Sequence, residues 1–223
     1  MPVTRAIAFD AFTTFDPGSV ATLAEEVFPG RGAELAGAWR TRQFEYAWLR
    51  TLMGRYADFW QVTDEALVFT AAFLKLELTA DRRERLMQAF LELKAWPDAL
   101  SALSALKRAG VRLAFLSNLT ARMLDAAVKN SGLDGLFEPH LTTDLVRAYK
   151  PDPRAYQMGV DAFGVPREQV VFAAFGGWDA AGARWYGYPS FWVNRLGAAP
   201  EELIAADASG PDLAQLATWV STH

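Results

Sequence analysis

“AIAFD”, residues 6–10, is a short apolar run that stops at an aspartate. A run of this length, bounded by polar residues, is typical of a strand buried on both faces of a sheet. Three further runs have the same form: “VRLAFLSN” to Asn118, “VVFAAFGG” to Gly177 and the weaker “YPSFWVNR” to Arg195. Helical segments lie between the later runs, with start signals at Pro97, Thr120, Asp152-Pro153 and Gly210-Pro211 and glycine ends at Gly110 and Gly132. This alternation predicts an α/β fold with a parallel sheet and helices on both faces.

The region between the first two predicted strands has a different pattern. From about residue 17 to 95, its apolar residues recur at helical spacing, among them Leu35, Trp39, Phe44, Trp48, Leu52, Leu67, Leu86 and Phe90. We therefore predict that residues 17–95 form an inserted helical domain, and that residues 1–16 and 96–223 form the core. Because the insert leaves the core beside Asp10, we expect it to cover the adjacent sheet edge as a lid.

Composition restricts the chemistry that this chain can perform. Its 223 residues include 22 Lys and Arg against 26 Asp and Glu, a net charge of −4, so neither nucleic acid nor a membrane is an expected partner. There is no cysteine and there are only two histidines, His140 and His223, which excludes thiolate chemistry and disfavours a histidine zinc site or a Ser-His-Asp triad. No apolar run is long enough for a signal peptide or a membrane span. We expect a cytoplasmic protein that acts on a small molecule.

Reactive side chains follow the predicted strands at the points where these end. Asp10, Ser117-Asn118 and Asp179 each follow an apolar run, and Lys150 follows a weak strand at “HLTTDLV”. Each has an ordinary interpretation alone, as a turn residue, a helix cap, a helix-start residue or a solvated lysine. The carboxyl ends of parallel strands meet at one edge of a sheet, where ligands bind. The combination therefore indicates an active site at that edge.

Five motifs resemble those of the haloacid dehalogenase superfamily, and within it the hydrolytic L-2-haloacid dehalogenases, along nearly the whole chain. They are “FDAFTT”, “WRTRQFEYAWLRTLMGRY”, “LSN”, “YKPDPRAY” and “WDAAGA”. The second motif lies in the insert, where branches of this superfamily differ, and is the most specific. The resemblance implies a Rossmann-like core with an inserted helical cap domain.

The resemblance also implies a mechanism without a metal or another cofactor. Asp10 would attack C2 of a small 2-substituted carboxylic acid, expel the substituent and form an aspartyl ester that water cleaves. Lys150 would hold Asp10 ionised, Ser117 would anchor the substrate carboxylate, and Arg40 with Asn118 would receive the leaving anion. Asp179 would orient Lys150 or the water. The catalytic set implied by the motifs further includes Thr14 and Tyr156, and the substrate-binding set is Ala11, Phe12, Phe44, Phe59, Phe175, Gly176 and Trp178.

The chain departs from the family at several of these positions. Phe12 replaces a tyrosine, Thr13 replaces a glycine, one residue is missing between Thr14 and Phe15, and Ala174-Phe175-Gly176 replaces the usual Ser-Ser-Asn. Phe12 and Phe175 also occupy positions where a phosphatase of the superfamily has carboxylates for leaving-group protonation and for magnesium, which disfavours that activity.

Three functions remain open on these residues. They are 2-haloacid dehalogenation, the same displacement on another 2-substituted acid such as ring opening of azetidine-2-carboxylate, and binding of a small carboxylate without catalysis. Retention of Asp10, Arg40 and Lys150 argues against the third, because unused buried charges are costly. The eight tryptophans fit either core packing or the apolar face of a homodimer, an assembly common in the family.

Overall fold

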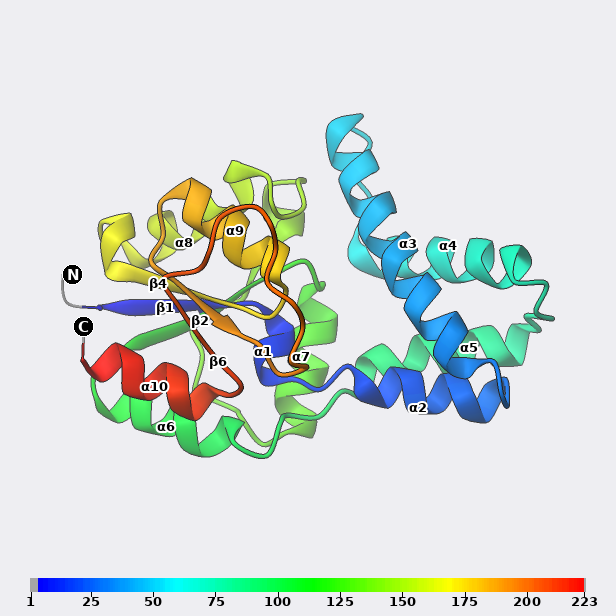
Figure 1. Cartoon of the computed structure of the whole chain (residues 1–223), viewed down its shortest axis with the longest axis horizontal. Helices are drawn as coiled ribbons and strands as arrows, with labels where there is room; N and C mark the ends of the chain where they lie inside the picture. The colour runs from blue at the N-terminus through cyan, green and yellow to red at the C-terminus, as the bar shows by residue number, and fades with distance from the viewer. Residues whose placement is uncertain (1–3, 223) are drawn as a thin grey trace.

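The sheet is parallel throughout and has six strands. A computed structural model describes residues 4–222. Residues 1–3 and His223, at the outer ends of the predicted core, lie outside the described part. The strand order is β3-β2-β1-β4-β5-β6 (Figure 1). The strands are β1 (Ala6–Phe9), β2 (Arg112–Ser117), β3 (Leu141–Thr142), β4 (Val170–Ala174), β5 (Ser190–Val193) and β6 (Ala208–Gly210). The predicted α/β class is confirmed.

The predicted lengths of several strands differ from those in the structure. The strand predicted at “HLTTDLV” is reduced to Leu141–Thr142, because the chain turns at once into the 3-10 helix η2 (Thr143–Leu145). The strands predicted to reach Asn118 and Gly177 end at Ser117 and Ala174. The edge strand β6 was not predicted, because its sequence, Ala-Ser-Gly, contains no apolar run.

Helices cover both faces of the sheet, as predicted (Figure 1). Side chains of β1 alternate between two hydrophobic clusters: Ile7 and Phe9 belong to one, Ala6 and Ala8 to the other. The first cluster includes residues of α6 (Ala99–Arg108), α7 (Ala121–Asn130) and α10 (Leu213–Ser221), and the second includes residues of α8 (Pro153–Phe163) and α9 (Gly177–Tyr186). A 3-10 helix, η3 (Arg167–Gln169), precedes β4.

The helix boundaries have local causes in the sequence. Thr120 caps α7 by accepting a hydrogen bond from the Met123 amide, and Asp152 caps α8 in the same way, with Pro153 in the first turn. After α6 and α7 the chain passes through Gly110 and Gly132 with φ of 82° and 63°, a conformation that favours glycine. These predicted starts and ends are confirmed.

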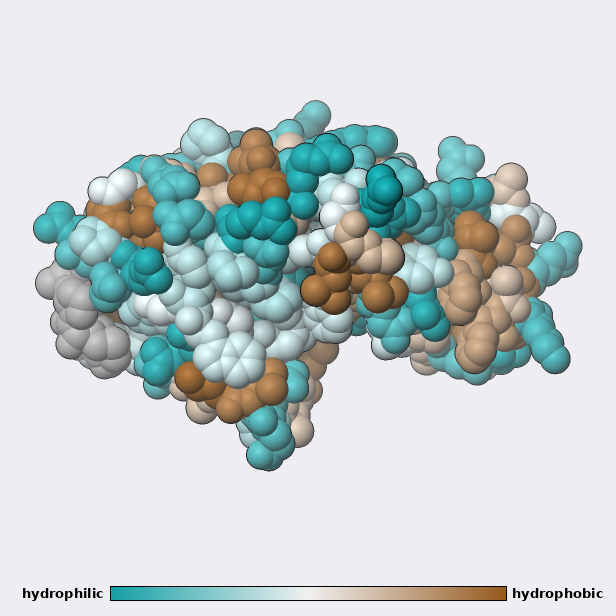
Figure 2. All heavy atoms as spheres, turned by 90° about the horizontal axis from the view of Figure 1, so that it is seen from above, coloured by the Kyte–Doolittle hydropathy of each residue, from teal (hydrophilic) through white to brown (hydrophobic). Residues whose placement is uncertain are grey.

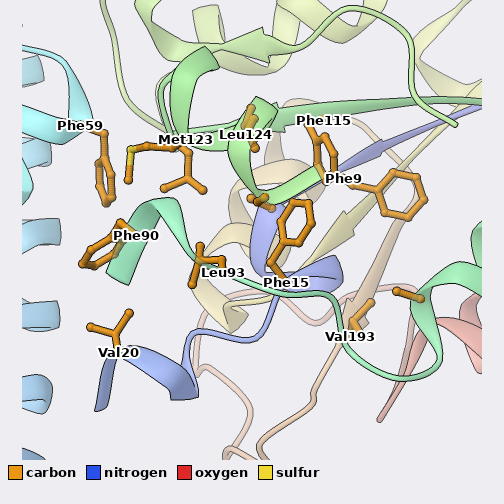
Figure 3. Packing of buried hydrophobic residues seen from close by; sticks show 14 of the residues in the cluster. Phe9, Phe15, Val20, Phe59, Phe90, Leu93, Phe115, Met123, Leu124 and Val193 are labelled. Carbon is orange, nitrogen blue, oxygen red and sulfur yellow. The ribbon is translucent and has the colours of Figure 1, made fainter. Parts of the chain in front are cut away.

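The segment between β1 and β2 is built from helices. After the short α1 (Ala11–Thr14) come α2 (Gly18–Val27), α3 (Gly32–Leu52), α4 (Phe59–Phe73), α5 (Ala80–Gln88) and the 3-10 helix η1 (Ala89–Leu91). Figure 1 shows α2–α5 beside the sheet, on the side toward which β1 and α1 run. One hydrophobic cluster runs from Phe59 and Phe90 to Phe15 and Phe115 (Figure 3). Within residues 4–222, no helix is both long enough and apolar enough to cross a membrane.

Candidate active site

Asp10 lies at the centre of the sheet, at the carboxyl end of β1. The strand order reverses at β1, since β2 pairs with one side and β4 with the other. A ligand crevice in a parallel sheet forms at such a reversal. Asp10 is the N-cap of α1, and its Oδ2 accepts a hydrogen bond of 3.1 Å from the Phe12 amide. It is therefore both the turn residue that local sequence predicts and a carboxylate held in a fixed orientation.

Lys150 lies between two carboxylates. Its Nζ is 2.9 Å from Oδ1 of Asp10 and 2.6 Å from Oδ2 of Asp179, and its side chain is 1% exposed. Burial alone would lower the pKa of Lys150, but the charges of Asp10 and Asp179 outweigh it and raise the pKa. The lysine is therefore charged at neutral pH and forms close ion pairs with both carboxylates.

Asp179 belongs to the first turn of α9 and points into the protein. Its Oδ1 accepts a hydrogen bond of 2.7 Å from the Tyr156 hydroxyl. Burial raises the pKa of Asp179 to about 6, against the opposing effect of Lys150. Burial also raises the pKa of Tyr156, and Asp179 adds to the effect, so the phenol stays a neutral donor.

One small cavity adjoins these groups. It holds about 360 Å³ of space not filled by protein atoms, part of it open to solvent. Eleven residues named in the sequence analysis line it, together with Leu119: Asp10, Phe12, Arg40, Phe44, Phe59, Ser117, Asn118, Phe175, Gly176, Trp178 and Asp179. The structure thus brings together residues from β1–α1, α3, α4, β2 and β4–α9.

Arg40 reaches this cavity from α3 through an aromatic cage. Its guanidinium carbon lies 5.8 Å from the ring centre of Phe12, 5.5 Å from that of Phe44 and 5.3 Å from that of Phe175. Burial lowers the pKa of Arg40, and the negative charge of Asp10 opposes this shift. Within residues 4–222 the guanidinium makes no hydrogen bond or close ion pair, so its donors are left for an anion in the cavity.

Ser117 and Asn118 have partners in the loop after β2. The Ser117 hydroxyl accepts a hydrogen bond of 3.0 Å from the Leu119 amide, and Oδ1 of Asn118 accepts one of 3.2 Å from the Lys150 amide. In both hydrogen bonds the side chain of Ser117 or Asn118 is the acceptor. The Ser117 O–H and the Asn118 NH₂ remain as donors toward the cavity.

Four predicted site residues lie outside the cavity lining. Lys150 and Tyr156 lie behind it, in contact with Asp10 or Asp179. Thr14 is fully buried and its Oγ1 lies 3.5 Å from that of Thr13. Ala11 is also fully buried and packs in the hydrophobic cluster, because the first turn of α1 directs its methyl group inward.

Two residues at this site were not predicted from the sequence. Leu119 lines the cavity, and Trp48 donates a hydrogen bond of 3.1 Å from Nε1 to the Lys150 carbonyl oxygen, which joins α3 to the lysine. Trp48 lies one helical turn after Phe44 in the apolar stripe of the insert, and this spacing was an available signal.

The loop after β4 is shaped by glycine. A Cβ atom at Gly176 would lie 2.7 Å from Nε1 of Trp178, so the indole occupies the space that a side chain at position 176 needs. The Phe175 side chain lies against Phe12, with ring centres 5.9 Å apart. Residues 174–176 therefore supply apolar surface to the cavity and no side-chain donor. Nowhere in the described range 4–222 do three or more His, Cys, Asp or Glu side chains cluster as they would around a metal ion.

Comparison with protein families and curated proteins gives one consistent result. Residues 4–187 match a hydrolase family described as haloacid dehalogenase-like hydrolase. The chain is 43% identical over 204 residues to an (S)-2-haloacid dehalogenase of Pseudomonas sp. (strain YL), covering 91% of this chain and 88% of that one. It is also 43% identical over 200 residues to haloacetate dehalogenase H-2 of Moraxella sp. (strain B), covering 89% of each.

Solved structures agree with these sequence matches. The L-2-haloacid dehalogenase RSc1362 superposes with a TM-score of 0.96 at 43% identity, over 98% of this chain and 99% of the other. The L-2-haloacid dehalogenase of Xanthobacter autotrophicus, solved with chloropropionic acid covalently bound, superposes with a TM-score of 0.91 at 35% identity, over 98% and 99%.

Proposed function

Because the chain belongs to the haloacid dehalogenase-like hydrolases, we propose that it hydrolyses small 2-halo carboxylic acids to 2-hydroxy acids through an ester of Asp10. The observation that carries this proposal is the geometry around Asp10. The Asp10 carboxylate faces a small cavity, and Nζ of the buried Lys150 lies 2.9 Å from one of its oxygens. Arg40, whose guanidinium makes no hydrogen bond or close ion pair among the described residues, lines the same cavity.

In the first step, an Asp10 oxygen attacks C2 of the substrate. A bond from C2 to this oxygen forms as the bond from C2 to the halogen breaks, and the halide leaves with the bonding electrons. The Arg40 guanidinium and the Asn118 amide stabilise the departing anion, while the Ser117 hydroxyl donates to the substrate carboxylate. The rings of Phe12, Phe44, Phe59, Phe175 and Trp178 exclude water from C2.

In the second step, water attacks the carbonyl carbon of the Asp10 ester. The bond between that carbon and the ester oxygen breaks, and the 2-hydroxy acid departs. One proton of the water passes to the departing alcohol oxygen, the other is released through the base to solvent, and Asp10 regains its carboxylate with one oxygen from water. Asp179, whose pKa burial raises to about 6, lines the cavity, shares Lys150 with Asp10 and is the base in this proposal. Since Ala174 and Gly176 carry no polar side-chain group, the water must be oriented by Asp179, Lys150 and backbone groups.

A single-turnover experiment in oxygen-18 water tests this proposal. Enzyme in excess over 2-chloropropionate or chloroacetate should release chloride and acquire one label in the peptide that contains Asp10, as measured by mass spectrometry. Asp10→Asn should release no chloride, and Asp16→Asn, at a partly buried loop carboxylate outside the cavity lining, should behave as the parent does. Label in the product but not in Asp10 would contradict an aspartyl ester.

The same assay distinguishes the other functions that the sequence leaves open. Label in Asp10 during turnover of azetidine-2-carboxylate, with no chloride released from halo acids, would assign the displacement to a ring nitrogen. Neither turnover nor label with any 2-substituted acid would indicate a protein that binds small carboxylates without catalysis.

We propose further that residues 17–95 act as a cap domain on the core formed by residues 1–16 and 96–223. The two chain connections between the cap and the core lie side by side. The Asp16 amide donates a hydrogen bond of 2.9 Å to the Lys94 carbonyl oxygen, and Phe15 and Ala95 form an isolated antiparallel β-bridge. The cap holds the core through Trp48 and through the Tyr149 hydroxyl, which donates 2.6 Å to the Ala57 carbonyl. Variants Trp48→Phe and Tyr149→Phe should loosen this contact, and faster amide exchange in residues 143–152 would measure it.

We also propose that the protein is a cytoplasmic homodimer. Apolar side chains gather over the inserted helices at the right of Figure 2. On α4, Phe69 and Phe73 stack on each other and are 38% and 70% exposed. Sedimentation equilibrium should give twice the chain mass. Phe73→Glu, which adds a charge to this surface, should give a monomer, whereas Leu145→Glu, at an exposed leucine of the core, should not.

A further inference from the structure

The helix that follows Asp10 is too short to satisfy its own backbone. In α1 (Ala11–Thr14) only the Ala11 carbonyl has a helical partner, the Phe15 amide at 2.9 Å. The next three carbonyl groups accept hydrogen bonds from outside the helix. Phe12 O accepts 3.1 Å from Nε1 of Trp96, and Thr14 O accepts 2.9 Å from the Trp96 amide. Unpartnered carbonyls at a helix end must be satisfied in this way.

Arg195 supplies the bonds to the middle carbonyl. Its Nε and Nη2 atoms donate 3.1 Å and 2.7 Å to the Thr13 carbonyl oxygen, and its side chain is 5% exposed. The guanidinium also makes two bonds with Asp98, of 2.6 Å and 3.1 Å, and lies 5.0 Å from the ring centre of Trp96. Four of its five N–H donors are thereby engaged in a fixed orientation.

The opposite end of α1 sets the orientation of Asp10. Oδ2 of Asp10 accepts from the Phe12 amide, and the Asp10 carbonyl oxygen accepts 2.7 Å from the Thr13 hydroxyl. A rotation of α1 would therefore move the Phe12 amide away from the carboxylate. A cation at the carboxyl end of a helix also opposes its partial negative charge.

We propose that Arg195, held by Asp98, is a positioning residue for Asp10 and acts through the short helix α1. It touches neither the cavity nor Lys150, and it lies in the loop after β5, 182 residues from Thr13. The claim that catalysis depends on this contact rests on the proposed role of Asp10 as nucleophile.

The test compares two arginines that make similar networks. Arg112 also pairs through two nitrogens with a carboxylate, Glu138, donates 2.6 Å to the Phe163 carbonyl and lies 5.2 Å from the Phe163 ring, but at the opposite end of the sheet. Arg195→Gln should lower kcat for ester formation roughly 10- to 100-fold with KM changed by less than about threefold, because small misplacements of a reacting group have this effect. Arg112→Gln should leave kcat unchanged. Arg195→Lys should recover part of the lost kcat. An ammonium group can donate to the Thr13 carbonyl oxygen, but it cannot reproduce the paired bonds that the planar guanidinium makes with Thr13 and Asp98.

A second measurement does not depend on activity. Amide hydrogen exchange in residues 10–15 should accelerate in Arg195→Gln and stay at the parental rate in Arg112→Gln. If the parent turns over no 2-substituted acid but the exchange differs as expected, the proposed function fails and the positioning of α1 stands. Parental kcat and parental exchange in folded Arg195→Gln would overturn the inference.

Discussion

Nζ of Lys150 lies 2.6 Å from Oδ2 of Asp179, and both side chains are only 1% exposed. Asp10 is the third member of this group, and both carboxylates contribute to the lining of the cavity. Two carboxylates therefore share one buried cation, and each of the three charges depends on the other two.

Lys150→Met should abolish turnover and destabilise the fold. The substitution leaves Asp10 and Asp179 without their buried counterion, an effect of about 3–5 kcal/mol in the free energy of unfolding. Urea unfolding and halide release measure the two effects. Lys107→Met is the control, because exposed Lys107 bonds only the Gly135 and Leu136 carbonyl groups. Equal losses of stability in the two variants would contradict this account of Lys150.

Arg40→Met should lower kcat/KM without lowering stability. Removing a donor that stabilises developing charge typically lowers the rate about 100- to 1,000-fold. The folded state should be as stable as the parent or more stable, because Arg40 is a largely buried charge with no close carboxylate partner among the described residues. Arg42→Met, two residues along α3 on the outer surface, should retain parental kinetics. A large fall in the melting temperature of Arg40→Met would contradict the expectation that this variant loses activity but keeps its stability.

The pH dependence follows from Asp179. Its pKa is about 6 in the folded protein, whereas an aspartyl group in an unfolded chain ionises near 4. The folded state therefore binds this proton more tightly, so the stability contribution is fully present below about pH 4 and is lost as the pH rises to about 6. Relative to Asp179→Asn, the parent should lose on the order of 3 kcal/mol of stability across this interval.

Turnover should change in the opposite direction over the same interval. As Asp179 ionises it becomes available as a base, so kcat should rise through an apparent pKa near 6 that belongs to the Asp10–Lys150–Asp179 group as a whole. A steady-state pH profile with 2-chloropropionate measures this value. Constant kcat from pH 5 to 8 would exclude Asp179 as the base.

Gly176→Ala should strain the cavity wall through Trp178. The added Cβ meets the indole at 2.7 Å, and overpacking of this kind costs about 1–3 kcal/mol. Trp178→Phe should relieve part of the cost, so a double-mutant cycle of unfolding free energies should show coupling between the two positions. Gly37→Ala, where a Cβ meets nothing within 4 Å on α3, should be neutral or stabilising. Additive effects at positions 176 and 178 would contradict the steric explanation.

Local pattern in the sequence is enough to predict the fold class and to place several reactive side chains near strand ends. The apolar runs at 6–9 and 170–174 are strands, and Thr120 and Asp152 begin helices. Asp10 follows β1, Ser117 ends β2, and Asp179 lies in the helix after β4. The edge strand β6 is not predicted by hydrophobic pattern, because it has only three residues and its burial depends on neighbours far along the chain. Hydrophobic periodicity indicates which face of a segment is buried, but it does not indicate which other segments pack against that face.

The residue types in the chain limit the chemistry that is available to carboxylates, a lysine at a strand end and an arginine between the first two strands, with no thiol. How these groups act depends on their packing in the folded chain. This packing places Lys150 between two carboxylates, encloses Arg40 in three rings, and brings Arg195 to the carbonyl of Thr13. Such contacts join residues up to 182 positions apart, and their energies depend on burial and on distances of a few ångströms, which follow from packing and not from the order of residues along the chain.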